Sequence, residues 1–220
     1  MSETGWKDTM AECMADLQLE NVLSQVREAL LADDDPLEIV KVCEDGLHHV
    51  GELYERGEYF LAGLIMAGEI FRQAMELIVP HLTAPACQGG GCVLLGTVQG
   101  DIHDMGKNLV AALLRCHGFR VLDLGVDVTP AEFARQVLTL RPDVVGLSGL
   151  LTTSHAPMRE VVQLLRTSVS PDRQPKAIII GGSTVNEAAC RFVGADFWAS
   201  DAMHGVRLCQ QVVSRSEAEL

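Results

Sequence analysis

The most constraining feature of this sequence is the regular alternation of short apolar runs and helical patterns after residue 91. The runs are apolar over most of their length, which is typical of strands buried on both faces. Strands of this kind separated by helices indicate a parallel, doubly wound sheet. We therefore predict an α/β fold with a five-stranded parallel sheet in flavodoxin-like order. The expected strands are Cys92–Val98, Phe119–Leu124, Asp143–Leu147, Ala177–Ile180 and Asp196–Ala199. The expected helices are Met105–His117, Pro130–Leu140, His155–Ser168, a short piece near Thr184–Val193, and Asp201–Val213.

The first 82 residues have a different periodicity, because their apolar residues recur at helical spacing. The longest such pattern runs from Tyr59 to Val79 and ends at Pro80. We predict a bundle of four helices joined by short loops, with Met66, Phe71 and Met75 first of all in its core.

Residues 83–91 contain a proline and three glycines without periodicity, which predicts a linker. The expected organisation is a helical cap domain at residues 1–85 and an α/β domain at residues 92–220.

Composition limits the possible partners and compartments. The net charge of −13 argues against nonspecific binding to nucleic acid or to an anionic membrane. No apolar run approaches the roughly 20 residues of a spanning helix, and the N-terminus has no signal-peptide character. The seven cysteines lack a Cys-x-x-Cys pair, so we expect reduced thiols in the cytoplasm. A zinc site at Cys87 and Cys92 is a weak alternative, because the spacing is poor.

The heptapeptide from Asp101 to Lys107, Asp-Ile-His-Asp-Met-Gly-Lys, follows the first expected strand and precedes a helix. Ligands of α/β sheets bind at such strand-to-helix turns. His103 is free there to meet a metal, and Asp101 is close enough to accept a hydrogen bond from the ring nitrogen that the metal does not use. Asp104 is expected to cap the helix that follows.

Small residues gather at the ends of three expected strands, at 96–100, 146–150 and 181–184. These ends share the carboxyl edge of the sheet, and glycine there lets a large, flat ligand approach the backbone. The sequence has neither the glycine pattern of dinucleotide sites nor a phosphate loop. The pattern therefore indicates a slot for some other ligand.

These motifs in this order resemble the cobalamin-binding domain shared by methionine synthase, corrinoid methyl-carrier proteins and adenosylcobalamin mutases. The resemblance rests on Asp101-x-His103-x-x-Gly106, Ser148-Gly149-Leu150 and Gly181-Gly182, and it covers about residues 15 to 215. With its helical cap, the chain is similar to a free-standing corrinoid protein of an anaerobic methyltransferase system. The resemblance implies a cobalamin cofactor, as methylcobalamin, cob(I)alamin or a related corrinoid.

The resemblance also implies residue roles. His103 would be the lower axial ligand of cobalt in place of dimethylbenzimidazole, with Asp101 accepting its other N–H and Ser154 supporting that aspartate. Ser148 would meet the displaced tail, beside Thr152. The implied cofactor-binding set is Gly100, Asp101, Ile102, His103, Asp104, Gly106, Ser148, Gly149, Leu150, Thr152, Ser154, Gly181, Gly182 and Ala202.

Several of these residues have simpler readings. Ser148 could end a strand, Ser154 could cap the next helix, and Gly181-Gly182 could be a tight turn. Lys107 and Asn108 are expected in the first turn of a helix, with side chains that reach solvent or the corrin's amides. In the cap, Phe60-Leu61 and the helix after it resemble the segment that covers the methyl face. The alternative to a core position for Met66, Phe71 and Met75 is that some of them face the corrin.

The function implied is a methyl carrier that is not itself an enzyme. Its partners would be a substrate-specific methyltransferase and a second methyltransferase that passes the methyl group to tetrahydrofolate or coenzyme M, with a reductive activase as a further candidate. The alternatives are a small subunit of an adenosylcobalamin mutase, a cobalamin-dependent sensor, or a cofactor-free binding module. The helical cap favours the carrier. The methyl donor is open between methanol, methylamines, betaines and aryl methyl ethers.

Overall fold

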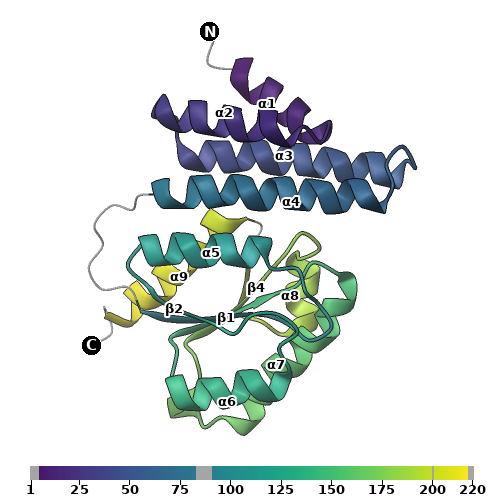
Figure 1. Cartoon of the computed structure of the whole chain (residues 1–220). Coiled ribbons are helices and arrows are strands. Elements are labelled where there is room, and N and C mark those ends of the chain that lie inside the picture. Colours follow the sequence, from purple (N-terminus) through teal and green to yellow (C-terminus); the bar gives the residue numbers. More distant parts are fainter. Residues whose placement is uncertain (1–4, 83–90, 200, 218–220) are drawn as a thin grey trace. The chain divides into compact units, whose positions relative to one another are not determined.

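The computed structural model describes residues 5–82, 91–199 and 201–217. The chain divides into two compact units, Met1–Thr83 and Ala84–Leu220, and each is described by itself (Figure 1). Of the expected linker at residues 83–91, only Gly91 lies within the described residues. No helix in the described ranges combines the length and the apolar character needed to cross a membrane.

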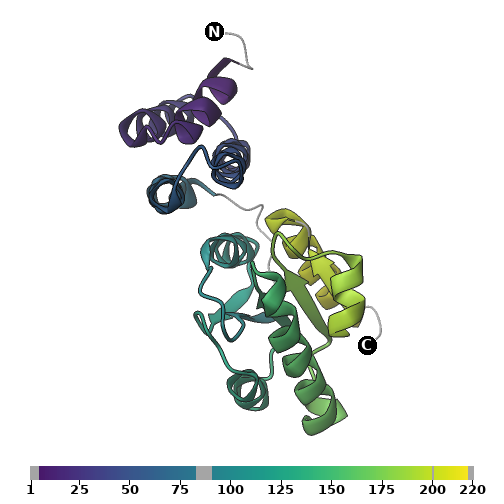
Figure 2. The same ribbon diagram turned by 90° about the vertical axis from the view of Figure 1, so that its right-hand side faces the viewer.

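The first unit is the predicted four-helix bundle. Its described residues form α1 (Gly5–Ala15), α2 (Leu19–Leu31), α3 (Pro36–Glu55) and α4 (Leu61–Ile78), followed by a short 3₁₀ turn, η1 (Val79–His81). Figure 2 shows helices of this unit nearly end-on, so that their side-by-side packing is visible. The start of α3 has a local cause, because the Asp35 side chain accepts a hydrogen bond from the backbone N–H of Leu37 and proline stands at the first helical position.

Packing within the bundle depends on a close helix approach. A Cβ atom on Gly46 of α3 would lie 2.5 Å from Cβ of Met14 of α1, so only glycine permits this contact. Phe71 of α4 is buried, as expected. Met66 is not part of the core, because its side chain is 47% exposed, and so it falls under the alternative that some of these residues face the corrin, which stays a prediction. Met66 is one of several apolar residues at the start of α4 that the bundle leaves uncovered.

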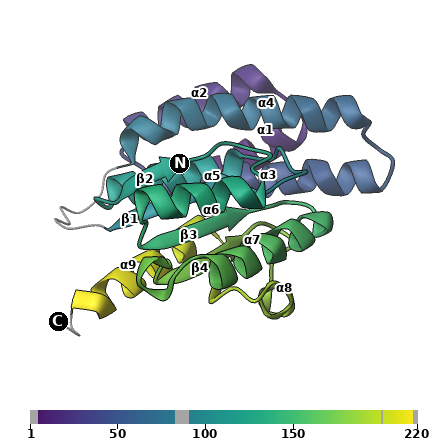
Figure 3. The same ribbon diagram turned by 90° about the horizontal axis from the view of Figure 1, so that it is seen from below.

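The second unit has the predicted five-stranded parallel sheet in the order β2-β1-β3-β4-β5. The strands are β1 (Cys92–Thr97), β2 (Arg120–Asp123), β3 (Val144–Ser148), β4 (Ala177–Gly181) and β5 (Phe197–Ala199). The helices are α5 (Met105–Cys116), α6 (Pro130–Leu140), α7 (His155–Ser168), α8 (Glu187–Val193) and α9 (Ala202–Glu217), with 3₁₀ turns η2 (Thr152–Ser154) and η3 (Pro171–Arg173). Helices α5 and α9 pack together on one face of the sheet, and α6 and α7 cover the other (Figures 1 and 3).

Helix α8 is shorter than the expected piece from Thr184. It begins at Glu187 because the Asn186 side chain accepts a hydrogen bond from the N–H of Ala189, at 3.0 Å, and so caps the first turn. The residues before it form a turn, in which the N–H of Val185 donates to the carbonyl of Gly182.

The strand register places four residues in one row at the carboxyl edge of the sheet. Thr97 pairs with Ser148, Ser148 with Gly181, and Gly181 with Ala199. The loops that follow these strands therefore converge on one edge, where parallel sheets bind ligands.

Candidate functional site

The centre of the site is the buried carboxylate of Asp101, in the loop between β1 and α5. Its Oδ1 accepts hydrogen bonds from the backbone N–H of His103, at 3.0 Å, and from Nδ1 of the His103 ring, at 2.6 Å. Its Oδ2 accepts from the N–H groups of Leu150 and Leu151, at 2.8 and 3.3 Å, and from Oγ of Ser154, at 2.7 Å. Five donors therefore converge on a side chain with no exposed surface.

These contacts determine which form of the carboxyl is stable. Burial raises the pKa of Asp101, but the hydrogen bonds from His103, Ser154 and Leu150 outweigh it and hold the pKa far below its usual range. An ionised carboxylate only accepts hydrogen bonds, so Nδ1 of His103 must carry the proton. In the neutral ring, the lone pair is then on Nε2. Because the side chain is 49% exposed, that nitrogen is available to a metal.

A second aspartate, which the sequence analysis did not single out, holds the backbone of the same loop. Oδ1 of Asp127 accepts from the N–H of Gly100 at 2.8 Å, and the N–H of Asp127 donates to the carbonyl of Asp101 at 3.0 Å. Asp127 has a φ of 53° and Gly100 a φ of 81°, so this clamp uses two residues in the left-handed region. No sequence signal indicated these contacts, because Asp127 lies in the loop after β2, far along the chain from the loop that it holds.

The three glycines of the expected slot have different environments. A Cβ atom on Gly182, whose φ is 141°, would lie 2.0 Å from the carbonyl oxygen of Gly149. A Cβ atom on Gly149 would lie 2.6 Å from Cβ of Ser154. Gly182 therefore lets the loops after β3 and β4 touch each other, whereas Gly149 lets the loop after β3 pack closely on its own Ser154. Gly181 differs, because no atom beyond its two chain neighbours lies within 4 Å of its Cβ position, which leaves open space at the sheet edge.

Apolar side chains surround His103 in sequence and in the loops that follow three adjacent strands. Ile102 is 73% exposed after β1, Val126 is 38% exposed after β2, and Leu150 and Leu151 are 38% and 42% exposed after β3. Exposed apolar groups at one sheet edge mark a surface that a ligand or partner covers. The arrangement suits a broad, largely apolar ligand, with the half-exposed ring of His103 at the same edge.

The remaining expected residues lie at the same edge with weaker roles. Thr152 is exposed in η2, Gly106 is exposed in the first turn of α5 with open space at its Cβ position, and Ala202 is half-buried at the start of α9. Ser148 is half-buried at the end of β3, and Ser154 makes no capping hydrogen bond to α7. Ser200, which precedes Ala202 in the sequence motif, lies outside the described residues.

Two expectations for the first turn of α5 are wrong. Asp104 occupies the capping position, but its side chain makes no capping hydrogen bond and instead accepts from Nδ2 of Asn108 at 3.0 Å. Lys107 does not reach solvent, because its side chain is 2% exposed and its Nζ contacts Oδ2 of Asp123 at 2.5 Å. The parallel pairing of β1 with β2 brings Asp123 to this helix turn, which the local sequence pattern does not reveal.

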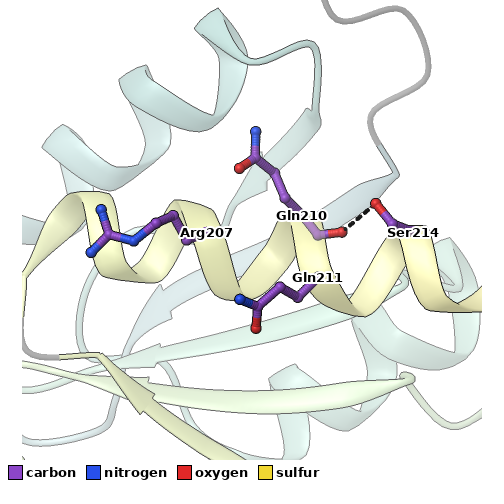
Figure 4. A pocket seen from close by; sticks show the side chains of 4 residues that line it. All are labelled: Arg207, Gln210, Gln211 and Ser214. Atoms are coloured by element: carbon purple, nitrogen blue, oxygen red, sulfur yellow. Dashed lines mark hydrogen bonds between the residues drawn. The ribbon is translucent and has the colours of Figure 1, made fainter.

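Two other places were considered as ligand sites. Across residues 5–82, 91–199 and 201–217, no cluster of three or more His, Cys, Asp or Glu side chains is arranged to hold a metal ion, and Cys87 of the alternative zinc site lies outside these ranges. A hollow of about 380 Å³ lies along α9 and is lined by Arg207, Gln210, Gln211 and Ser214 (Figure 4). None of the expected cofactor residues lines it.

Comparison with known proteins gives the class of the chain. A family model described as a B12 binding domain matches residues 91–207, and a second model of the same description matches residues 6–78. Dimethylamine corrinoid protein 3 of Methanosarcina acetivorans is 32% identical over 205 residues, which cover 93% of this chain and 95% of that protein. Trimethylamine corrinoid protein 2 of Methanosarcina mazei is 35% identical over 191 residues, covering 84% and 87%. The monomethylamine corrinoid protein of Methanosarcina barkeri has a similar structure, with a TM-score of 0.88, 26% identity, and coverage of 96% of this chain and 100% of that one.

Fold and site thus define an α/β protein that presents the hydrogen-bonded ring of His103 at a ligand-binding sheet edge. The chain belongs to the B12 binding domain family, and its cofactor is cobalamin or a related corrinoid. The residues present fit such a group. Gly181 leaves open space at the sheet edge, the exposed apolar side chains of the neighbouring loops suit a macrocycle, and the ring of His103 carries a nitrogen of the kind that binds cobalt.

Proposed function

We propose that this protein holds its corrinoid with His103 as the lower axial ligand, in place of the cofactor's own base, and carries a methyl group between two methyltransferases. The observation that carries the proposal is the hydrogen-bond relay from Ser154 through Asp101 to Nδ1 of His103, with Nε2 open. A surface histidine without a metal role would not need a fully buried, fivefold hydrogen-bonded carboxylate behind its ring.

The chain's own residues would bind and orient the cofactor rather than react. Asp101 fixes the tautomer and direction of the His103 ring, and its negative charge increases the electron-donating strength of Nε2. Gly181 leaves space for the displaced tail, with Ser148 as the polar neighbour in the same row of the sheet. When bound, the corrinoid supplies a cobalt centre that accepts a methyl group and releases it to an acceptor. The protein in this proposal is a carrier subunit and not an enzyme.

The four-helix unit is proposed as the cap that shields the reactive face, as residues 1–85, with residues 92–220 as the cofactor domain and 83–91 as linker. Support comes from the start of α4, where Phe60, Leu61 and Ile65 are 80%, 62% and 65% exposed. Apolar side chains with that exposure need a covering surface, and a corrin's upper face is of suitable chemistry. A cap of this kind excludes water and must move aside for each partner.

The proposed partners are a substrate:corrinoid methyltransferase and a second methyltransferase that passes the methyl group to tetrahydrofolate or coenzyme M. The similar proteins are named for dimethylamine, trimethylamine and monomethylamine. Methylated amines are therefore the first donor class to test. A reductive activase is a further candidate partner.

The decisive experiment is electron paramagnetic resonance of the full chain, loaded with hydroxocobalamin and reduced to the cobalt(II) form. Two samples are compared, one of them labelled with ¹⁵N-histidine. A change of the nitrogen splitting with the label identifies imidazole as the ligand. An unchanged splitting from the nitrogen of dimethylbenzimidazole, or failure to take up cobalamin, would overturn the proposal.

Two variants sharpen the result. His103→Ala should abolish the histidine signal, whereas His117→Ala should retain it. His117 stands at the other end of α5, where its Nδ1 bonds to the carbonyl of Leu113, and so it is a matched control on the same helix. Cobalamin-loaded wild-type protein should then accept a methyl group from a methylamine when a methylamine methyltransferase is present. It should accept none from the methylamine when that enzyme is left out. Adenosylcobalamin-dependent rearrangement activity with a partner barrel would instead favour the mutase subunit.

A further inference from the structure

Thr97, the last residue of β1, is a buried hydroxyl in a strand whose other buried residues are apolar. Its backbone is already used, because its N–H donates to the carbonyl of Gly125 and its carbonyl accepts from the N–H of Val128, both at 3.0 Å. Valine has nearly the same shape and is well suited to a buried parallel strand. Strand formation and packing therefore do not account for the hydroxyl group of Thr97.

The hydroxyl group contacts the peptide of His103. Oγ1 of Thr97 donates a hydrogen bond to the carbonyl oxygen of His103 at 3.0 Å. Oδ1 of Asp101 holds the N–H of the same residue, also at 3.0 Å. The backbone of His103 is thus held on both sides. Of these two anchors only the Thr97 bond is independent of Asp101, because Oδ1 of Asp101 also holds the ring. Three anchors on one residue define both the position of its Cα atom and the direction of its ring.

A chain of polar contacts holds Thr97 in turn. The Gly125 carbonyl accepts from Thr97, and the Gly125 N–H donates to Oδ1 of Asp123 at 2.9 Å. Oδ2 of Asp123 pairs with the buried Nζ of Lys107. The contacts therefore run from the first turn of α5, through the end of β2, to the end of β1 and back to the loop before α5.

We propose that Thr97 is a positioning residue for the axial histidine, and that the Lys107–Asp123 pair supports it. The inference rests on the proposed role of His103. Loss of the hydroxyl would leave a buried carbonyl without this donor and would let the His103 peptide shift. A ligand displaced from the cobalt axis binds more weakly, although no group in contact with the cofactor has changed.

The test compares Thr97→Val, which removes the hydroxyl at similar volume, with Thr97→Ser, which keeps it. In the cofactor-free chain, amide hydrogen exchange across residues 101–104 should be faster in the valine variant and near wild type in the serine variant. In the cobalamin-loaded chain, the ratio of histidine-bound to histidine-free cobalt(II) should fall about tenfold in the valine variant only. Asp123→Asn should give a smaller change in the same direction.

Unchanged exchange and an unchanged ratio in Thr97→Val would overturn the inference. Equal losses in the valine and serine variants would also overturn it, because the effect would then come from packing and not from the hydroxyl. If the valine variant does not fold, Thr97→Ala replaces it in the same comparison with Thr97→Ser. Failure of the two proposals can be told apart. Absence of histidine ligation in the loaded wild-type protein would refute the proposed function. Hydrogen exchange in the cofactor-free variants would still decide whether Thr97 holds the peptide of His103.

Discussion

Oγ of Ser154 donates a 2.7 Å hydrogen bond to Oδ2 of Asp101, which lies 53 residues earlier in the chain. Both side chains are buried, and the bond joins the loop after β1 to the turn before α7. Because the other oxygen of Asp101 holds the ring of His103, one carboxylate links the turn before α7 to the proposed metal ligand.

Ser154→Ala should test that relationship directly. The variant removes one donor from a buried carboxylate that keeps four others, so we expect the free energy of unfolding to fall by about 1–2 kcal/mol. Thr153→Ala is the matched control, because Thr153 is an exposed hydroxyl of the same turn. Urea unfolding of both cofactor-free variants measures the difference, and equal stabilities would show that the Ser154 bond contributes nothing.

Asp101→Asn should change how stability depends on pH. The pKa of Asp101 is lower in the folded chain than in the unfolded one, so its ionised form stabilises the fold above the unfolded pKa of about 3.9. That contribution is lost as pH falls below this value. We therefore expect the wild type to be more stable than the variant at pH 7, and the gap to narrow toward pH 3. Urea unfolding across this range would contradict the assignment if the gap stayed constant.

The same variant should alter the cofactor. An amide in place of the carboxylate reduces the electron density that reaches Nε2 of His103 and weakens this nitrogen as a ligand. We expect a shift of the cobalt redox potential and more protein without histidine ligation in Asp101→Asn. Spectroelectrochemical titration measures both, and an unchanged potential with an unchanged spectrum would exclude electronic coupling through Asp101.

Two adjacent glycines should respond in opposite ways to the same substitution. Gly182→Ala places a methyl group against the Gly149 carbonyl at a φ of 141°, so we expect a loss of stability of about 3 kcal/mol or failure to fold. Gly181→Ala enters open space, and its stability should stay within about 0.5 kcal/mol of wild type while affinity for cobalamin falls. Unfolding and cobalamin titration separate the two effects. Unchanged affinity in Gly181→Ala would mean that the tail lies elsewhere.

Lys107→Met should reveal the buried ion pair. Removal of Nζ leaves Asp123 without its cation, and we expect a destabilisation of about 2–3 kcal/mol, less than for a fully buried pair because the Asp123 side chain is 25% exposed. The double variant Lys107→Met with Asp123→Leu should recover part of this loss. Lys7→Met is the comparison, because the Lys7–Glu38 pair is exposed and its loss should change stability little. Equal effects at the two lysines would refute the burial argument.

Sequence periodicity predicted most of the fold because it reports burial. The strand from Cys92 is apolar on both faces, and only a parallel sheet covered by helices buries such a strand. The bundle was predicted for the same reason, and Met66 shows the limit of that reasoning. A helical apolar pattern marks which residues avoid water, but it does not distinguish a face buried in the unit from a face left for another surface.

The sequence by itself determined the fold class, the approximate strands and helices, and the motif that contains His103, because local spacing and apolar pattern encode them. Only the tertiary structure decided which distant groups meet. It placed Ser154 on Asp101, Asp127 on the backbone of the same loop, Asp123 on Lys107, and the carbonyl of His103 on Thr97. The physical reason is that parallel strands bring their carboxyl ends to one edge, so hydrogen-bond partners there are set by sheet register and not by separation along the chain.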